Sequence, residues 1–335
     1  MLQAIMSDLS ALPDLHVVTS IDHRLVETFS NLGSAGCPHV VDNAATEQEL
    51  FDELVAGCDV SLIIAPETDR ILSRRVQRVI DLGGTPINCA PPTVDLCGDK
   101  LAMSGHLMNH GIETIPTCSV TLEEQEPWSK VGGACVIKPR DGAGSWLTFG
   151  LVENDFESWR SAKSQIEQEG AATRMIVQPW IRGRSISVAG ICHTTGSIEL
   201  FPIGSQSIEG SRFCYRGGII PADLDSQVVE TVYQMAHQTL ASIPGLRGYV
   251  GIDLLLPEST PKSPRIVEIN PRLTTSYLGY RRLCFDNIAG RLLAPVSGNQ
   301  RLLCWKPQSV SFGPGDPVEF HGRPDIQASS GICSP

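Results

Sequence analysis

Two strand-like runs joined by a short loop constrain the fold of this chain more than any other feature. They lie in GYVGIDLLLPESTPKSPRIVEINPR, residues 248–272, with the runs at 249–256 and 265–270. A hairpin that closes about residues 260 and 261 places Asp253 directly opposite Glu268. Because side chains alternate along a strand, Glu268 and Asn270 share one face while Val267 and Ile269 face the core. The pattern predicts a β-ribbon that brings three oxygen-bearing side chains together.

These three side chains form a candidate metal site. Opposed residues on paired strands have Cβ atoms roughly 5 Å apart, so two carboxylates there repel each other unless a cation lies between them. Mg²⁺ prefers such oxygen ligands together with substrate phosphates. The alternative is a solvated sheet face with two unrelated acids. Pro271 favours the site, because it holds Asn270 extended and fixes where the guanidinium of Arg272 follows.

The first part of the chain predicts an α/β domain of Rossmann-like type over residues 1–92. Helical and strand-like segments alternate along it, and strands separated by helices indicate a parallel sheet. Such domains normally open with a strand, whereas this one opens with a helix, so we expect its first strand to be missing or supplied from elsewhere. The segments are helices at 2–12, 47–55 and 70–82 and strands at 16–20, 61–65 and 86–88.

The remaining chain predicts two α+β lobes and a tail. A Pro-rich linker at 89–98 runs into a single helix that continues past Lys100 and ends at Gly111. Residues 93–182 then form a small lobe and residues 183–300 a second lobe. Residues 301–335 are rich in proline and are predicted to be an irregular C-terminal extension. The expected strands are 134–138, 147–151, 175–181, 185–192 and 197–202, and the expected helices are 155–169 and 226–242.

Two lysines upstream of the ribbon are candidate phosphate ligands. Lys138 ends a strand in VIKPRDGAGS, beside a loop whose backbone N–H groups could wrap phosphate oxygens through Gly142, Gly144 and Ser145. A loop of this kind is often only a turn, and Lys100 alone could be a solvated surface residue. Residue 147 is Leu, so the loop does not have the dinucleotide GxGxxG pattern.

Two further segments carry candidate contacts. Gln178, Trp180 and Ile181 follow an apolar strand at the junction of the lobes, where backbone groups could meet an adenine edge, although Trp180 could equally belong to the core. Arg216 precedes two glycines and is predicted on a flexible loop, where it could reach a carboxylate or a phosphoryl group, or simply be exposed.

Taken in order, these elements resemble the ATP-grasp superfamily. The resemblance covers roughly residues 85–282, and the preceding α/β segment resembles the domain that usually comes before the two grasp lobes. Four segments, IIAPETDRIL, DLCGDKLAMSGHL, YRGGIIP and VEINPRLTTSYLGYR, are similar to the tyramine-glutamate ligase group associated with methanofuran biosynthesis.

The resemblance implies a role for each matching residue. Lys100 and Lys138 would contact nucleotide phosphates, the loop 141–145 would close over them, and residues 178–181 would line adenine. Asp253, Glu268 and Asn270 would hold Mg²⁺ or Mn²⁺. Arg272 would stabilise the transferring phosphoryl group, with Arg216 and Lys138 as further catalytic residues. Ser185 stands where many members have a ribose-binding glutamate, and Gln178 where they have an acidic hinge residue. Glu67, Asp69 and Tyr277 are weaker candidates for the substrate pocket.

The implied activity is that of an ATP-dependent carboxylate-amine ligase that forms an amide through an acyl phosphate, with glutamate as the acid and tyramine or another small amine as acceptor. It needs no nucleophilic side chain, and the sequence has no GxSxG elbow. The alternative is an ATP-binding regulatory or scaffold protein that has the grasp fold and no turnover. A nicotinamide-dependent oxidoreductase is not favoured, because no glycine fingerprint follows an early strand.

The composition limits which binding partners and which cellular compartment we expect for this chain. With 26 Lys+Arg against 37 Asp+Glu, the net charge of −11 disfavours nucleic acid, although a local basic pocket could still bind one phosphorylated molecule. The sequence has no apolar run of the length or context that would predict a membrane span or a signal peptide. The 11 cysteines lack any CxxC pair, which favours reduced thiols in a cytoplasmic protein. The resemblance implies small-molecule acid and amine substrates as partners, with a homodimer as an option.

Overall fold

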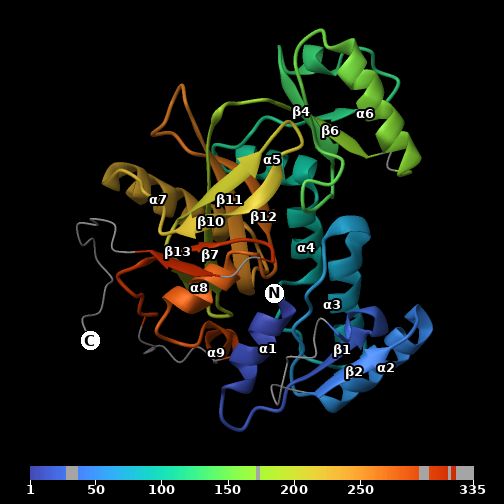
Figure 1. Ribbon diagram of the computed structural model, residues 1–335, viewed down its shortest axis with the longest axis vertical. Coiled ribbons are helices and arrows are strands. Elements are labelled where there is room, and N and C mark those ends of the chain that lie inside the picture. The colour runs from blue at the N-terminus through green and yellow to red at the C-terminus, as the bar shows by residue number, and fades with distance from the viewer. Residues whose placement is uncertain (28–36, 171–173, 294–301, 316–317, 322–335) are drawn as a thin grey trace.

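The computed structural model describes residues 1–27, 37–170, 174–293, 302–315 and 318–321, which form three parts around a central site (Figure 1). The helices are α1 (Leu2–Ser10), α2 (Ala44–Gly57), α3 (Ile71–Asp81), α4 (Pro91–Gly98), α5 (Lys100–Asn109), α6 (Phe156–Gln168), α7 (Ser226–Ser242), α8 (Tyr277–Leu283) and α9 (Ile288–Leu293), with 3₁₀ turns η1 (His23–Leu25), η3 (Thr68–Arg70) and η4 (Pro127–Lys130). The strands are β1 (Val18–Asp22), β2 (Cys37–Val41), β3 (Cys118–Val120), β4 (Cys135–Pro139), β5 (Phe149–Leu151), β6 (Met175–Pro179), β7 (Gly183–Cys192), β8 (Ile198–Leu200), β9 (Gly204–Glu209), β10 (Cys214–Ile220), β11 (Gly248–Pro257), β12 (Arg265–Asn270), β13 (Ser309–Phe312) and β14 (Glu319–His321).

The N-terminal part has the expected α/β character but a smaller sheet than predicted. β1 and β2 pair in parallel, and β2 was not expected from the sequence. The predicted strands 61–65 and 86–88 are wrong, because only a single parallel bridge, Ser61 to Pro86, joins them. The side-chain amide of Asn88 accepts from the N–H of Ile63 and donates to its carbonyl, both at 2.8 Å. This side chain therefore takes the place of the backbone ladder.

Helix α1 lies beside α9, which is far from it in sequence (Figure 1). Asp8 on α1 accepts a 2.5 Å hydrogen bond from the Tyr277 hydroxyl and pairs with Arg281 on α8. Tyr277 is fully buried in this link, so its prediction as a substrate-pocket residue is wrong. The start of the chain is thus anchored to the large lobe.

The small lobe is a 4-stranded antiparallel sheet in the order β3-β6-β4-β5, covered by α6. Its predicted strands and helix are confirmed, with β3 as an addition. Trp159, Ala162 and Ile166 recur at helical spacing on one face of α6 and are buried against the sheet. This packing holds β4 and β6 in place beside the site.

The large lobe is built on an 8-stranded sheet, whose path runs β12-β11-β7-β9-β10-β13-β14 with β8 paired to β7. The predicted helix α7 and both ribbon strands are confirmed, and α7 buries Val228, Val232 and Ala236. The prediction of a wholly irregular C-terminal extension is wrong, because β13 pairs with β10 and buries Val310 and Phe312. The apolar side chains of Val310 and Phe312, at alternate positions, allow this segment to pack as a strand beside β10.

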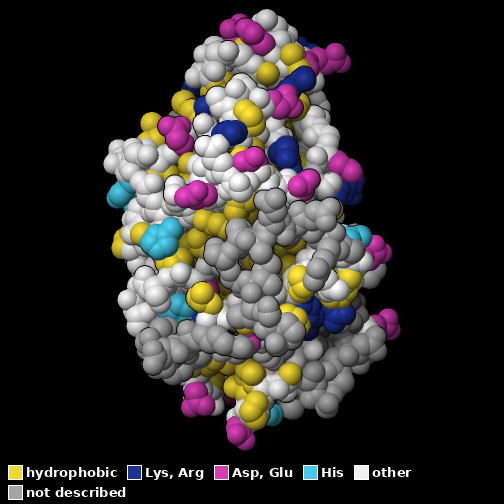
Figure 2. Space-filling view, turned by 90° about the vertical axis from the view of Figure 1, so that its left-hand side faces the viewer, with side chains coloured by type: hydrophobic (Ala, Val, Ile, Leu, Met, Phe, Trp, Pro, Cys, Tyr) yellow, Lys and Arg dark blue, Asp and Glu magenta, His cyan; other side chains and the backbone are white. Residues whose placement is uncertain are grey.

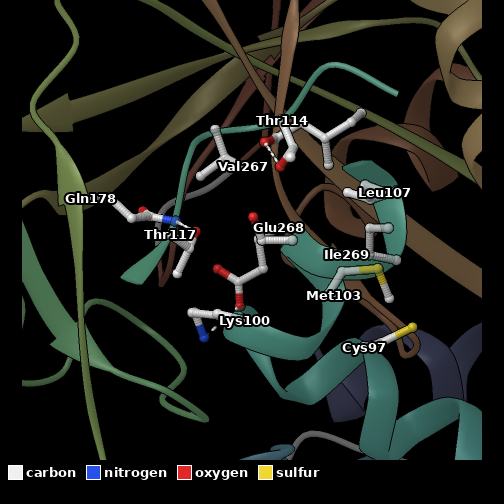
Figure 3. A pocket seen from close by; sticks show the side chains of 12 residues that line it. Cys97, Lys100, Met103, Leu107, Thr114, Thr117, Gln178, Val267, Glu268 and Ile269 are labelled. Carbon is white, nitrogen blue, oxygen red and sulfur yellow. Dashed lines mark hydrogen bonds and ion pairs between the residues drawn. The ribbon is translucent and has the colours of Figure 1, made fainter. Parts of the chain in front are cut away.

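The register of the β11–β12 ribbon places Asp253 opposite Glu268, as predicted. The prediction that Val267 faces the core is wrong. A bulge shifts the register after Asp253, so that Leu254 pairs with Ile266 and Val267 is left without a partner. Ile266 and Ile269 are each 1% exposed, whereas Val267 lines the same cleft as Glu268 (Figure 3). With this bulge, Glu268 lines the cleft while Ile266 and Ile269 stay in the core.

No helix in the part of the chain that the structure describes is long and apolar enough to cross a membrane. On the face shown in Figure 2, Lys and Arg side chains are interspersed with Asp and Glu over the upper lobe, so the charges there are not sorted by sign. Nine cysteines among the described residues are free thiols.

Candidate nucleotide and metal site

Lys100 enters the site at the start of helix α5. The prediction of a linker at 89–98 is wrong, because Pro91–Gly98 form helix α4, which ends just before Asp99. Asp99 has extended backbone angles and caps α5, accepting from the N–H groups of Leu101 and Ala102 at 3.2 and 3.0 Å. Lys100 is therefore the first residue of α5 and is 8% exposed. Its ammonium donates to the carbonyl of Gly142 at 2.6 Å and lies 3.2 Å from Glu268 Oε1 (Figure 3). The interpretation as a solvated surface lysine is wrong.

Lys138 on β4 supplies a second cation from the small lobe. Burial, together with the nearby charge of Lys100, lowers the pKa of Lys138 to about 8, against the opposing effects of Glu268 and Asp253. Two ammonium groups, that of Lys100 on α5 and that of Lys138 on β4, thus act on Glu268. This is the charge arrangement that a polyphosphate requires.

The two carboxylates of the ribbon differ in their protonation behaviour. Burial and the charge of Glu268 raise the pKa of Asp253 to about 6, although hydrogen bonds from Gln206 and Asn270 oppose the shift. Burial also acts against the charge of Glu268, but the two lysines outweigh it and keep the pKa of Glu268 below its ordinary value. The formal charges of the two acids and the two lysines therefore balance, and the lysines act chiefly on Glu268.

This donor set fits a hard divalent cation. Asp253 has no ion-pair partner among the described residues, and Asn270 lies beside it, with the Asn270 amide nitrogen 3.1 Å from Asp253 Oδ2. Carboxylate and amide oxygens suit Mg²⁺, which commonly takes only one or two protein carboxylates. The described chain contains no group of three or more His, Cys, Asp and Glu that could hold a metal. A cation here would thus rely on the mixed carboxylate and amide set and on the nucleotide.

Arg272 is held at the end of β12 by Glu67, which comes from the N-terminal part. The Arg272 Nε donates to Glu67 Oε2 at 2.8 Å, and Nη2 lies 3.3 Å from the Asn270 oxygen. Glu67 is 8% exposed, and its second oxygen, Oε1, is buried without a hydrogen-bond partner in the described structure. The guanidinium therefore connects the ribbon to the N-terminal part.

The glycine-containing loop has the backbone of a tight turn. Gly144 and Ser145 have φ of 65° and 60°, a conformation that costs little for glycine but strains serine. The Ser145 hydroxyl donates to the carbonyl of Phe213 at 2.7 Å. Asp141 accepts from the N–H of Asp69 at 3.1 Å. The loop thus contacts both the β9–β10 hairpin and the N-terminal part, and Asp69 lies against it rather than in a separate pocket.

The hinge residues lie on or just after β6. Gln178 is buried and donates from Nε2 to the Thr117 hydroxyl at 2.8 Å (Figure 3). The half-buried Trp180 ring lies 5.6 Å from that of Phe213, and a Cβ on Gly150 would come within 2.7 Å of it, so it forms a wall and not core. Ile181 and Ser185 are also half-buried, Ser185 on β7.

A small cavity of about 10 Å³, room for about one water molecule, lies beside Lys100, Gln178 and Glu268. Most of its other lining residues belong to α5 and β12, and Lys138, Asp253 and Arg272 are not among them. The cavity is therefore a gap in the packing of α5 against β12 and only one corner of the candidate site.

The prediction that Arg216 lies on a flexible loop is wrong. Arg216 is on β10, at a bulge between Tyr215 and Gly217, and its ion pair is with Glu209 at 2.9 Å. Both side chains are 62% exposed. The two glycines after Arg216 made this segment resemble a turn in the sequence. In the structure, Tyr215, Gly217 and Gly218 all pair with β9. Arg216 is thus not among the residues that the structure gathers around Glu268.

Sequence reasoning did not find Gln206 or Thr117. Gln206 on β9 donates from Nε2 to Asp253 Oδ1 at 2.7 Å, although the two residues lie 47 positions apart. The strand β9 itself was not predicted, since its sequence GSQSIE is polar and small. No local pattern in the sequence predicts that the Gln206 side chain reaches Asp253 on the ribbon.

Comparison with known families agrees with this geometry. Residues 97–276 match the family model described as the ATP-grasp domain, and residues 15–94 match the pre ATP-grasp 3 domain. Among curated proteins, the tyramine–L-glutamate ligase of Methanocaldococcus fervens is 24% identical over 268 residues, which are 79% of this chain and 76% of that protein.

Solved structures share the fold. The biotin carboxylase domain of the Hydrogenobacter thermophilus 2-oxoglutarate carboxylase, in complex with MgADP, ADP and bicarbonate, has a TM-score of 0.75 at 13% identity, covering 92% of this chain and 70% of that one. The L-amino acid ligase from Bacillus licheniformis has a TM-score of 0.70 at 14% identity, covering 92% and 76%.

Proposed function

This chain belongs to the ATP-grasp family, and from that premise we propose that it is an ATP-dependent carboxylate-amine ligase. One observation carries the proposal: Asp253 and Glu268 face each other on the β11–β12 ribbon, with Lys100 and Lys138 beside them. The two acids suit a magnesium ion, and the two ammonium groups suit the triphosphate that it accompanies. A solvated sheet face without a ligand would not require these four charged groups to lie together.

The proposed reaction has two steps. An oxygen of the substrate carboxylate attacks the γ-phosphorus of ATP, and the bond to ADP breaks, which gives an acyl phosphate. The amine nitrogen then attacks the acyl carbon, phosphate leaves with the C–O electron pair, and the nitrogen loses a proton. Phosphoryl transfer needs mainly positioning and charge neutralisation, so no nucleophilic side chain is required.

Each residue of the cleft would have a defined part. Lys100 and Lys138 would neutralise the phosphates, and the loop 141–145 would enclose them. Asp253, Glu268 and Asn270 would hold Mg²⁺, which supplies charge neutralisation to the triphosphate. Arg272 would face the transferring phosphoryl group once its contact with Glu67 at 2.8 Å is rearranged. Trp180 and Gln178 would line the adenine, and Ser185 would lie near the ribose.

The substrates are proposed from the relatives. The curated relative from M. fervens is named for tyramine and L-glutamate, and a structural neighbour is named as an L-amino acid ligase. Both names describe a ligase that acts on an amino acid, and the first also names an amine. We therefore propose glutamate or a related amino acid as the acid, and tyramine or a similar small amine as the acceptor.

The test is direct. The protein is incubated with ATP, Mg²⁺, tyramine and L-glutamate carrying ¹⁸O in its carboxyl groups, and the products are analysed by mass. The proposal predicts ADP, an amide of glutamate and tyramine, and one ¹⁸O atom in each phosphate released. ADP formation at background across a broad panel of acids and amines would refute a ligase. Binding of MgATP without turnover would favour the regulatory alternative.

A further inference from the structure

A second cavity lies between the N-terminal part and the large lobe, separate from the nucleotide cleft. Its volume is about 580 Å³, and it shares no lining residue with the cleft around Lys100 and Glu268. It is bordered by α3, by residues 86–90, by the turn between β7 and β8, and by the end of α7 with residues 243–247. Small-molecule sites typically have volumes of roughly 300–1,000 Å³. The cavity is large enough for a ligand of moderate size.

The floor of this cavity is a preformed, closely packed junction. The N–H of Ala90 donates to the carbonyl of Gly245 at 3.2 Å, and the Thr93 hydroxyl donates to that of Pro244 at 2.6 Å. Gly245 has φ of 76°, and a Cβ there would come within 2.5 Å of Thr93 Oγ1. Only glycine permits this approach without rearrangement. The cavity therefore does not depend on a mobile wall.

The walls are mainly apolar, and the charged group among them is basic. No Asp or Glu is among the described residues that line the cavity, although the chain has a net charge of −11. The guanidinium of Arg247 is half-buried and makes no hydrogen bond or ion pair with any described residue. The apolar lining residues are Val76, Ile80, Ile198, Leu240, Ile243 and Leu246. A half-buried cation without a counter-ion is a binding point for an anion.

Two other polar side chains of the lining are already engaged. The Asn88 amide is bonded to the backbone of Ile63, and His193 lies 3.7 Å from Glu199. Burial raises the pKa of the Cys89 thiol to about 11 and that of Cys192 to about 12. Both thiols are therefore neutral at physiological pH and add no negative charge beside Arg247. The electrostatics of the cavity favour an anion.

From this arrangement we propose a second ligand site, which binds a small carboxylate with an apolar body. The carboxylate would pair bidentately with Arg247, and an aryl or branched aliphatic group would lie against the side chains of α3 and α7. The site goes beyond the proposed ligase reaction, because it uses none of the residues around Glu268. Its occupant is a separate molecule from the nucleotide.

The experiment uses the full chain saturated with MgADP and ligand-observed saturation-transfer NMR. The probes are 3-phenylpropionate and 4-methylpentanoate, each compared with its uncharged amide. We expect both acids to bind in the presence of MgADP, and each amide to bind about tenfold more weakly, because it lacks the charge that Arg247 recognises. Arg247→Met should abolish the preference for the acid.

Two further variants make the result specific. Arg160→Met removes an exposed arginine on α6, in the small lobe, and should leave binding unchanged. Ala241→Trp places a large side chain at an exposed position that lines the cavity, and should block both acids and amides. Absence of binding by every probe, unchanged binding in Arg247→Met and Ala241→Trp, or displacement of the acids by MgADP would each overturn the proposal.

Discussion

Asp253 and Glu268 show how position on one ribbon can give two carboxylates different properties. Glu268 is near both lysines, which keep its pKa low, whereas Asp253 is buried and repelled by Glu268, so its pKa is raised to about 6. The residue that lacks a cation is therefore the one that titrates near neutrality. If the pair holds a metal as proposed, we therefore expect metal binding to depend on pH.

We expect the affinity for MgADP to fall at acid pH. A raised pKa means that Asp253 is protonated below about pH 6 and charged above it, and Mg²⁺ binds only the charged form. Affinity should be constant above about pH 7 and weaken by about tenfold per unit below pH 6. Isothermal titration at several pH values measures this. Asp253→Asn is the control, whose affinity should be low and flat, and a pH-independent wild type would contradict the assignment.

The loss of the proton from Lys138 is expected to set the alkaline limit of activity. Its pKa is lowered to about 8, so its ammonium is charged below that pH and neutral above it. The value of kcat/KM for ATP should therefore decline above about pH 8 as the phosphate contact is lost. In Lys138→Arg the guanidinium stays charged, so the alkaline decline should disappear even if the overall rate is lower. An unchanged alkaline limb in this variant would show that another group is responsible.

Gln206 should tune Asp253 without being a catalytic residue. Its hydrogen bond at 2.7 Å favours the charged carboxylate, so Gln206→Leu should move the acid limb of kcat/KM upward by about one pH unit. Gln234→Leu on α7 makes the same exchange at an exposed position and should leave the profile unchanged. A lower rate with an unmoved acid limb would indicate a purely structural effect.

At the scale of the elements, the positions that the sequence could predict are those set by local pattern. The register of Asp253 and Glu268 follows from where the hairpin closes, and α7 and β12 follow from periodicity and their flanking residues. Helix α4 was missed because Pro91 and Pro92 suggested a linker, although proline is well accommodated in the first turn of a helix. The bulge at Val267 was missed because it depends on packing across the ribbon.

Long-range contacts could not be predicted in the same way. Arg272 meets Glu67 across 205 positions, and Gln206 meets Asp253 from a strand with no apolar alternation. The segment 61–65 has the residues of a strand, yet the side chain of Asn88 takes the place of its ladder partner. In each case a tertiary contact, and not a local conformational preference, decides which residues meet or whether a strand forms.

The turn that joins α7 to β11 tests the packing between elements. Gly245→Val adds a side chain within 2.5 Å of Thr93 at a φ of 76°, and should lower the free energy of unfolding by about 3 kcal/mol. Gly83→Val has a similar φ of 77° with nothing within 4 Å, and should cost only about 1–2 kcal/mol. Chemical denaturation measures both. Equal losses would mean that close packing at Gly245 contributes nothing.

At the scale of the whole molecule, the site is assembled from three parts. The small lobe supplies Lys138 and the glycine-containing loop, the large lobe supplies the ribbon, and the N-terminal part supplies Glu67 and the turn at Asp69. The site therefore exists only where the three parts meet.

The C-terminal strands belong to this assembly. A chain ended after residue 293 lacks β13, which exposes the edge of β10 and removes the buried Val310 and Phe312. We expect it to unfold at a temperature several degrees lower, or to aggregate. A chain ended after residue 321 keeps both strands and serves as the control in thermal unfolding. Equal stability of the two would show that β13 is dispensable.

The most direct test of the central claim, that the ribbon holds a metal nucleotide, is the comparison of MgADP and metal-free ADP binding in the wild type and in Glu268→Gln by isothermal titration at pH 7.5. The account predicts that wild type binds MgADP at least about tenfold more tightly than ADP, and that Glu268→Gln loses this difference while still binding ADP. Equal affinity of the wild type for both forms, or an undiminished magnesium effect in Glu268→Gln, would contradict it.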